Sequence, residues 1–501
     1  MNVQRVGPFF WFLSLLSISL LTFAMGLRSG NPYILSIPVL IPLIIWGVSK
    51  PEVVFLFAVA IMNSNMVLPG LPGDLELYHV LFFMVTVILF VRKALTKERS
   101  RSDGILLLVC GIYTFIVFYT MMARGIGFRI VGDGDQAGGM RYVLIYLGFL
   151  NLWLLPNIQI SQQALTRALL AFAILSFIPV LSEGIFLGTG GRIYHQYYFF
   201  KPGFGLGGAL MGTVEGTEVR YMSAAVLGRG LIYLPFFLIP YCNKNLLKYA
   251  LFIGMGLLVM AFSGFRSIFI GTTIFLLIAG YFLFQNHRKM YFVSFAVLGL
   301  CGYFLAWVGF EYLPFGIQRT VAILPFIGEG SLALSDGAGT MNFRLNVWSL
   351  ALNEVPDYLW LGRGLAFDYA ELTALEAYYS MSDMIFMRGL ISNLHNGPLE
   401  VLLYLGVPAV LMFISILVRV FQLCIKYLKT LKKTSDKYQM GVYFAAVILS
   451  TILLFMLSFG NPYATFYKIC LNLSLFRILQ LSQQQLGQTQ TDNILESSAN
   501  V

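Results

Sequence analysis

The stretch PLEVLLYLGVPAVLMFISILVRVFQL, residues 398–423, is long and apolar enough to cross a lipid bilayer as a single helix. Four polar residues stand directly before it: Ser392, Asn393, His395 and Asn396. Asn396 or Asn393 suits the N-cap of that helix, and Pro398 suits its first turn. His395 is therefore predicted to lie at a membrane boundary, either as a satisfied polar residue or as an acid–base group directed out of the membrane.

The composition of the whole chain is that of a polytopic membrane protein. Of 501 residues, 58% are hydrophobic and 11% are charged, and the mean hydropathy is +0.78. A soluble domain carries about 25% charged residues. The net charge of +10 does not indicate a nucleic-acid partner, because the basic residues cluster in short loops between apolar segments. The cysteines form no C-x-x-C pair, which argues against a disulfide or a zinc site.

Further apolar stretches predict an all-α fold with about 13–14 transmembrane helices. The first, residues 9–27, ends without a small-residue cleavage site and is interpreted as a retained span. A last stretch, residues 463–481, is interrupted by Lys468 and either spans the membrane or lies along its surface. The other predicted spans are 33–48, 52–68, 75–91, 104–122, 142–156, 162–187, 219–241, 246–262, 266–284, 290–310, 398–423 and 438–459.

Basic loops predict how the chain is oriented and divided. The most basic short loops, 91–101, 285–290 and 426–437, all fall on one side, so this side and both termini are predicted to be cytoplasmic. The predicted regions are residues 1–310 with transmembrane helices 1–11 and an outer loop at 188–218, a large outer loop at 311–397, C-terminal transmembrane helices at 398–481, and a Gln/Ser/Asn-rich disordered tail at 482–501. Loops this long without structure are rare. Because the large loop contains helical stretches such as NFRLNVWSLALNE, we expect it to form a helical cap.

Three side chains at the predicted outer face could carry chemistry: Arg266, Arg344 and His395. Arg266 opens the predicted span 266–284, and Arg344 lies on a predicted helix of the large loop with Trp348 one turn later on the same face. Each also has an ordinary structural explanation. A boundary arginine reaches lipid headgroups, a loop arginine is solvated or paired, and a histidine beside a helix start is structural.

Taken together, these residues resemble the bacterial O-antigen polymerase and O-antigen ligase superfamily. The motifs that carry the resemblance are SGFRS around Arg266, FRLNVW around Arg344, LGRGLAFD at 361–368, and LHNGPLEVLLYLG around His395 and Asn396. They span about residues 260–420 in the order found in the family. Ala409 stands three residues after Gly406, where the ligase pattern has Gly, Thr or Tyr, and this departure counts against a ligase.

The resemblance implies a glycosyltransferase at the periplasmic face of a bacterial inner membrane. Its donor would be an undecaprenyl-diphosphate-linked glycan, its acceptor a sugar hydroxyl, and no metal, other cofactor or nucleotide sugar would be needed. Arg266 and Arg344 would bind the diphosphate, since a guanidinium binds phosphate through two hydrogen bonds. His395 would act on the acceptor hydroxyl as a base. Asn396, Trp348 and Arg363 are expected to bind substrate.

An Arg-x10-Gly pattern occurs in both predicted outer loops, at Arg192 with Gly203 and at Arg319 with Gly330. Some polymerases of the superfamily carry such a pattern in two outer loops, so Arg192 and Arg319 are further candidates for holding a polysaccharide. The tyrosines of RIYHQYYFFK, residues 192–201, fit the same surface or an interfacial aromatic belt.

We therefore predict a polymerase of O-antigen or exopolysaccharide. The alternatives within the same class are an O-antigen ligase that uses lipid A core and a protein O-oligosaccharyltransferase. The alternative in a different class is a polysaccharide flippase or transporter, which is supported by Glu183 and Arg229 within predicted spans. Expected partners are the lipid-linked donor, an acceptor glycan or lipid A core, and membrane lipids, with a chain-length regulator and a flippase as further candidates.

Overall fold

The computed structural model describes residues 49–67, 76–96, 100–126, 136–190, 192, 222–238, 246–322, 324, 326–368, 394–431, 433, 435–457 and 459–499. The predicted spans at 9–27 and 33–48 and most of the predicted outer loop at 188–218 lie outside these residues. The chain divides into two compact units, residues 1–98 with 160–263 and residues 99–159 with 264–501.

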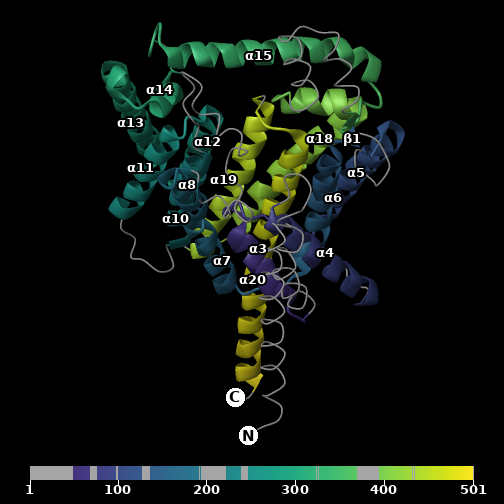
Figure 1. The fold of residues 1–501 in the computed structure, drawn as a ribbon. Helices are drawn as coiled ribbons and strands as arrows, with labels where there is room; N and C mark the ends of the chain where they lie inside the picture. Colours follow the sequence, from purple (N-terminus) through teal and green to yellow (C-terminus); the bar gives the residue numbers. More distant parts are fainter. Residues whose placement is uncertain are drawn as a thin grey trace. The chain divides into compact units, whose positions relative to one another are not determined.

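The first unit consists of apolar helices, which are drawn in purple, blue and teal in Figure 1. They are α3 (Pro51–Ile61), α4 (Leu77–Thr96), α7 (Gln162–Ile174), α8 (Phe177–Gly188), α10 (Met222–Leu238) and α11 (Leu246–Phe262). Helices α10 and α11 cross at Gly228 and Gly256, where a Cβ on Gly228 would lie 2.7 Å from the Gly256 carbonyl oxygen. Small residues allow such close helix contact within a membrane. Glu183 on α8 accepts the hydroxyl of Ser223 on α10.

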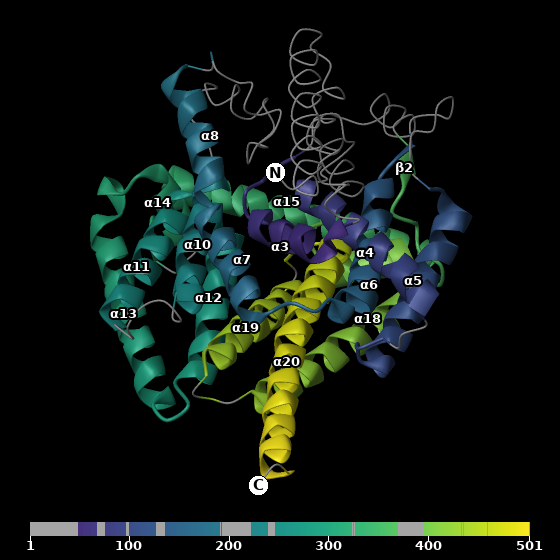
Figure 2. The same cartoon turned by 90° about the horizontal axis from the view of Figure 1, so that it is seen from below.

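The second unit holds α5 (Gly104–Arg124), α6 (Gly139–Leu154), α12 (Arg266–Leu283), α13 (Arg288–Gly309), α14 (Phe315–Val321), α15 (Leu332–Glu354), α18 (Gly397–Thr430), α19 (Asp436–Met456) and α20 (Pro462–Ala499), with the short 3-10 helices η1 (Leu155–Asn157), η3 (Phe310–Tyr312) and η4 (Val355–Tyr358). Helix α20 packs against α6, α18 and α19 (Figure 2). Rings of Tyr113, Phe413 and Phe466 meet in its core. The unit also contains one short antiparallel ladder, β1 (Gln136–Ala137) with β2 (Phe367–Asp368).

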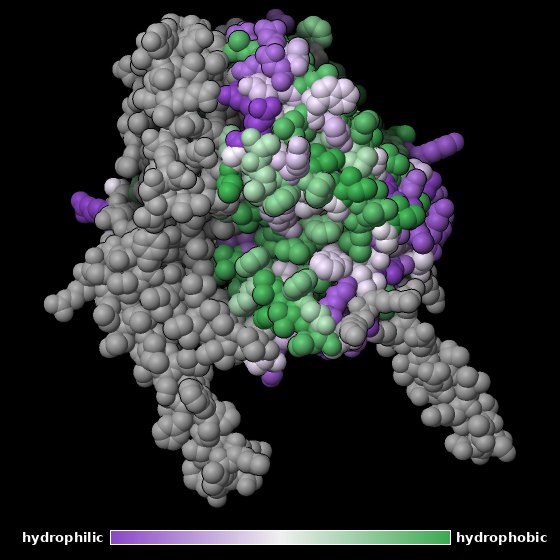
Figure 3. All heavy atoms as spheres, turned by 90° about the vertical axis from the view of Figure 1, so that its right-hand side faces the viewer, coloured by the Kyte–Doolittle hydropathy of each residue, from purple (hydrophilic) through white to green (hydrophobic). Residues whose placement is uncertain are grey.

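The described residues confirm an all-helical, multi-pass membrane fold. Eight of their helices are long and apolar enough to cross a membrane, and α3, α10 and α11 contain shorter apolar segments. Each predicted span that falls on described residues contains a helix, although 52–68 is helical only to Ile61 and 162–187 is divided between α7 and α8. Helix α5 exposes apolar side chains such as Leu108 and Phe115. In Figure 3 the coloured part of the face is mostly hydrophobic in its middle and hydrophilic towards its edges. Such a surface is expected where lipid replaces water.

Helical material also forms the predicted cap and the chain end. In Figure 1, α15 lies across the end of the helices of its own unit, and α14 packs against it. Helix α20 continues to Ala499, so it includes the stretch from 482 for which the composition predicted disorder. Gln and Leu are good helix formers, and a packed helix at 462–481 can propagate into them.

Candidate functional site at the start of helix α18

Helix α18 is kinked shortly after its start. Gly406 has φ 82° and ψ 174°, and a Cβ there would lie 2.6 Å from the Trp360 carbonyl oxygen, so only glycine fits this position. Pro408 follows, and because proline has no N–H it leaves the carbonyl of Tyr404 without its helical partner. The motif glycine of the predicted His-Asn pattern is therefore a backbone requirement of the kink.

The Gly-x-Gly turn satisfies the carbonyl groups that the kink releases. The N–H of Gly364 donates to the Tyr404 oxygen over 2.9 Å, and the N–H of Arg363 donates to the Leu403 oxygen over 2.8 Å. Two sequence motifs that are separated by the end of the large loop thus meet as one backbone joint. This joint fixes the direction of the short helical segment that begins at Gly397.

The residues just before that segment are held from both sides. Asn396 is the N-cap, and its Oδ1 accepts the N–H of Leu399 over 3.2 Å, which confirms the predicted cap. The Nε1–H of Trp348 on α15 donates to the Leu394 carbonyl oxygen over 2.7 Å. Between these two contacts His395 adopts φ 53°, which is uncommon for a residue other than glycine and marks a constrained position.

Glu400, one turn into α18, supports the same loop and was not predicted from the sequence. Its side chain is only 1% exposed, its carboxylate lies against the backbone amides of Leu394 and His395, and its Oε1 has no hydrogen-bond partner among the described residues. The cation of Arg141 on α6 lies close enough to stabilise it electrostatically. An acidic residue one turn into an otherwise apolar stretch was the available signal, because a buried carboxylate needs partners.

Arg344 lies beside His395, and one of its hydrogen-bond donors has no partner among the described residues. Its Nε atom is buried and has no hydrogen-bond partner among the described residues. Its guanidinium lies 5.8 Å from the ring centre of Phe459. Loss of hydration lowers the pKa of Arg344 from its usual value. Leaving a buried polar group unpaired costs about 1–3 kcal/mol, and more when it is charged, so this guanidinium is poised for an anionic partner.

His395 is biased towards its neutral form. Partial loss of hydration, followed by repulsion from the Arg344 cation, lowers the pKa of His395 below its usual 6.5, although the residue remains exposed. A neutral imidazole can accept a proton at neutral pH. The pair therefore combines a cation with an adjacent proton acceptor.

Arg266 is already engaged by the cap. Its Nε donates to the Arg319 carbonyl oxygen over 2.6 Å, and its NH2 donates to the Ala333 carbonyl oxygen over 3.0 Å. These contacts tie the start of α12 to α14 and to the start of α15. Arg344 stands eleven residues after Ala333 on α15, which is about 16 Å at 1.5 Å per residue. Arg266 and Arg344 therefore lie at separate places along α15.

The remaining predicted site residues have structural contacts. Arg363 pairs with Glu354 over 2.9 Å, and Arg319 is buried on α14. The indole N–H of Trp348 and the side-chain oxygen of Asn396 bind backbone, as described above. Arg192 is exposed just after α8 and belongs to the first unit, whereas every contact of this site lies in the second.

Residues 249–414 match the family model described as O-antigen ligase. All four motifs lie within this match, which confirms the resemblance that they carry. The enzymes of this family are membrane glycosyltransferases of the ligase and polymerase type, and they imply a lipid-linked glycan as substrate. No curated protein matches the chain.

Proposed function

We propose that this chain, which carries an O-antigen ligase domain, transfers a glycan from undecaprenyl diphosphate to a sugar hydroxyl at the membrane face where α18 begins. The observation that supports this most is the buried Nε of Arg344, which has no hydrogen-bond partner among the described residues and belongs to a guanidinium beside His395. A diphosphate at the membrane surface is the anion that such a guanidinium would bind. The lipid tail of the donor would keep that diphosphate at the level of the helix ends.

The proposed reaction is a single displacement with inversion. The acceptor oxygen forms a bond to the anomeric carbon, and the bond from that carbon to the phosphate oxygen breaks. The bonding electrons leave with the diphosphate, where Arg344 stabilises the added negative charge. The proton of the acceptor hydroxyl passes to the neutral imidazole of His395, whose lowered pKa keeps it unprotonated before the reaction.

Arg266 has two possible parts in this scheme. Its Nε and NH2 already bind the backbone of the cap, so it positions α14 and α15, and any remaining N–H could reach the distal phosphate. We propose the positioning role as the larger one, because its two described hydrogen bonds are directed at carbonyl groups and not outwards.

The finer assignment that we propose is a polymerase. A polymerase binds two lipid-linked glycans at once, and the predicted outer loop at 188–218 with Arg192 offers a second place to hold one. Ala409 is buried in α18, so its departure from the ligase pattern acts through helix packing and adds little to the choice. The ligase remains the second candidate because the matching family is described by that activity.

The deciding experiment is a deletion strain whose surface glycan is separated by gel electrophoresis. Loss of long chains, with single repeat units still attached to their final acceptor, is expected of a polymerase. Full-length chains that accumulate on undecaprenyl diphosphate, with none on lipid A core, would mean a ligase. Unchanged chain length and attachment would contradict both transferase assignments.

A further inference from the structure

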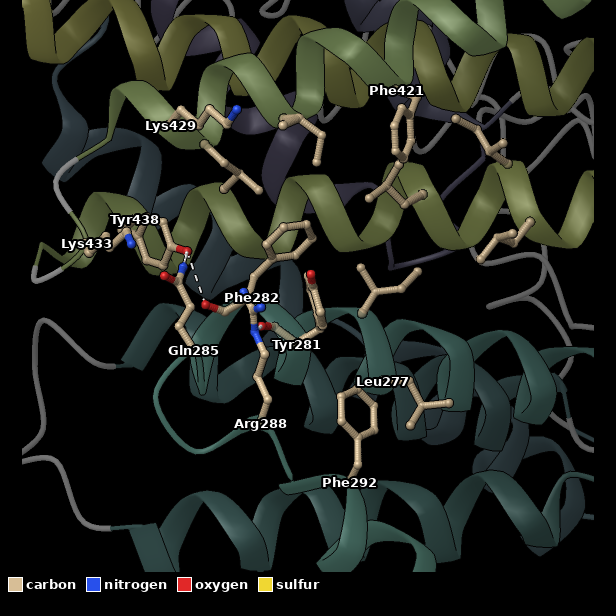
Figure 4. A pocket seen from close by; sticks show the side chains of 16 residues that line it. Leu277, Tyr281, Phe282, Gln285, Arg288, Phe292, Phe421, Lys429, Lys433 and Tyr438 are labelled. Atoms are coloured by element: carbon tan, nitrogen blue, oxygen red, sulfur yellow. Dashed lines mark hydrogen bonds between the residues drawn. The ribbon is translucent and has the colours of Figure 1, made fainter. Parts of the chain in front are cut away.

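A hollow of about 720 Å³ opens among α12, α13, α18 and α19 of the second unit, and its polar end lies at the ends of α12 and α18 that are opposite the candidate site. Figure 4 shows its lining. Aliphatic and aromatic side chains form most of the wall: Leu277, Ile278, Phe292, Phe421, Leu449 and Leu453. Several of these, including Phe421 and Leu453, are exposed, so the hollow is open to the surroundings.

Cationic side chains gather at one end of the hollow. Arg288, Lys429 and Lys433 line it there, and no aspartate or glutamate is among its described lining residues. The guanidinium of Arg288 lies 3.9 Å above the ring centre of Tyr281, and its Nε donates to the Tyr281 carbonyl oxygen over 3.1 Å. These contacts hold the cation in place, and its terminal amino groups make no hydrogen bond within the described part of the chain.

Polar groups complete that end of the hollow. Gln285 Nε2 donates to the Tyr438 hydroxyl over 2.5 Å, and this hydroxyl donates to the Phe282 carbonyl oxygen over 3.1 Å (Figure 4). The chemistry of the hollow is therefore divided, with cations and hydrogen-bonding groups at one end and hydrocarbon along the rest. A ligand that fits must carry an anionic head and an apolar chain.

The apolar part is long enough for an acyl chain. On α19 the hollow as a whole extends from Tyr438 at its polar end to Leu453 at its apolar end, about 22 Å at 1.5 Å per residue. One leaflet of the hydrocarbon core measures about 15 Å. Few other parts of the described chain pack on α13, since only 6% of its most apolar stretch is buried. Material that fills the hollow would connect α13 to α18 and α19.

We propose that this groove binds one anionic glycerophospholipid, with its phosphate between Arg288 and the two lysines and an acyl chain along α12 and α19. The lipid-linked donor is the less suitable occupant, because Arg266 and the end of α12 near Arg288 are separated by the helix, about 25 Å at 1.5 Å per residue. Basic pockets between transmembrane helices bind anionic headgroups in this manner. The lipid would hold α13 against the bundle.

The test is lipid titration of the purified full-length protein, with native mass spectrometry as the readout. Phosphatidylglycerol is expected to bind more tightly than phosphatidylethanolamine. The Lys429→Gln/Lys433→Gln variant is expected to weaken phosphatidylglycerol binding by about fivefold for each cation removed. The matched control is Lys289→Gln/Lys426→Gln, because these exposed lysines lie on α13 and α18, as Arg288 and Lys429 do, but do not line the groove. It should bind as the unchanged protein does.

A second pair of variants tests the apolar wall without altering charge. Leu453→Trp would fill the groove and should reduce the binding of both lipids, whereas Leu411→Trp on an exposed part of α18 outside the groove should not. Equal binding of the two lipids, or equal losses in groove and control variants, would overturn the proposal. So would competition between phosphatidylglycerol and a purified undecaprenyl-diphosphate glycan for the same bound position.

Discussion

The indole N–H of Trp348 and the carbonyl oxygen of Leu394 lie 2.7 Å apart, and this hydrogen bond fastens the residue before His395 to the helix that carries Arg344. This hydrogen bond gives a physical reason for the Arg-x-x-x-Trp spacing. Arginine and tryptophan one turn apart present a cation and a donor on the same side of α15. The tryptophan orients the histidine loop, and the arginine lies beside the histidine.

We expect Trp348→Phe to lower turnover about fivefold, since a lost hydrogen bond costs roughly 1 kcal/mol and loosens the loop. Binding of the lipid-linked donor should change little. Turnover and donor binding of the purified protein measure the two effects, with Trp307→Phe on the exposed part of α13 as the control. Full activity of Trp348→Phe would show that the hydrogen bond does not position His395.

Replacement of Arg344 by Lys should remove most activity, because an ammonium cannot reproduce the two parallel hydrogen bonds of a guanidinium to phosphate. Arg266→Lys should instead lower thermal stability along with activity, since it breaks contacts to the Arg319 and Ala333 carbonyl groups. Thermal unfolding in detergent and turnover of a purified donor separate these effects. If Arg344→Ala and Arg266→Ala both kept near-normal turnover, the assignment of the diphosphate site would be wrong.

His395→Ala should reduce glycan transfer by about 10²–10⁴-fold, the usual contribution of general-base assistance. In the unchanged protein the rate should fall only when the pH drops below the 6.5 that is usual for histidine, because the lowered pKa of His395 keeps its imidazole neutral down to a lower pH. Removing the neighbouring cation with Arg344→Gln should raise that pKa and move the acidic limb to higher pH. A limb that stays in place would exclude His395 as the titrating group.

Glu400→Leu should destabilise the protein by about 1–3 kcal/mol, since the amides of Leu394 and His395 would lose their acceptor. Glu400→Gln keeps an amide oxygen as acceptor and should recover part of the activity. Thermal unfolding and the transfer rate are the measurements. Equal losses in both variants would indicate that the carboxylate charge near Arg141, and not the acceptor, is what matters.

Labelling of single cysteines by an impermeant reagent tests the predicted orientation in whole cells. In a background without the native cysteines, Ala338→Cys on α15 should be labelled from the periplasm, and Lys433→Cys between α18 and α19 should not. Both positions are exposed, so accessibility within the protein is matched. Labelling of position 433 alone would place His395 in the cytoplasm and contradict the proposed donor.

The sequence alone determined the class of fold and the identity of the main candidates. Apolar runs, such as residues 398–423, must become helices in a bilayer because no other local structure pairs every backbone group there, so these spans could be placed without tertiary information. The order of the motifs around Arg266, Arg344 and His395 could also be recognised in the sequence. The N-cap at Asn396 was a candidate because asparagine is favoured at the start of helices.

Only the tertiary structure decided what each of those residues touches. Local pattern cannot tell that Arg266 binds carbonyl groups of the cap while the Nε of Arg344 has no partner in the described part of the chain, because both are arginines in apolar surroundings. Nor does it reveal Glu400, whose partners come from the preceding loop and from α6. Hydrogen bonds between segments distant in sequence depend on how helices pack, and packing places a charged group against a neighbour that its own helix does not contain.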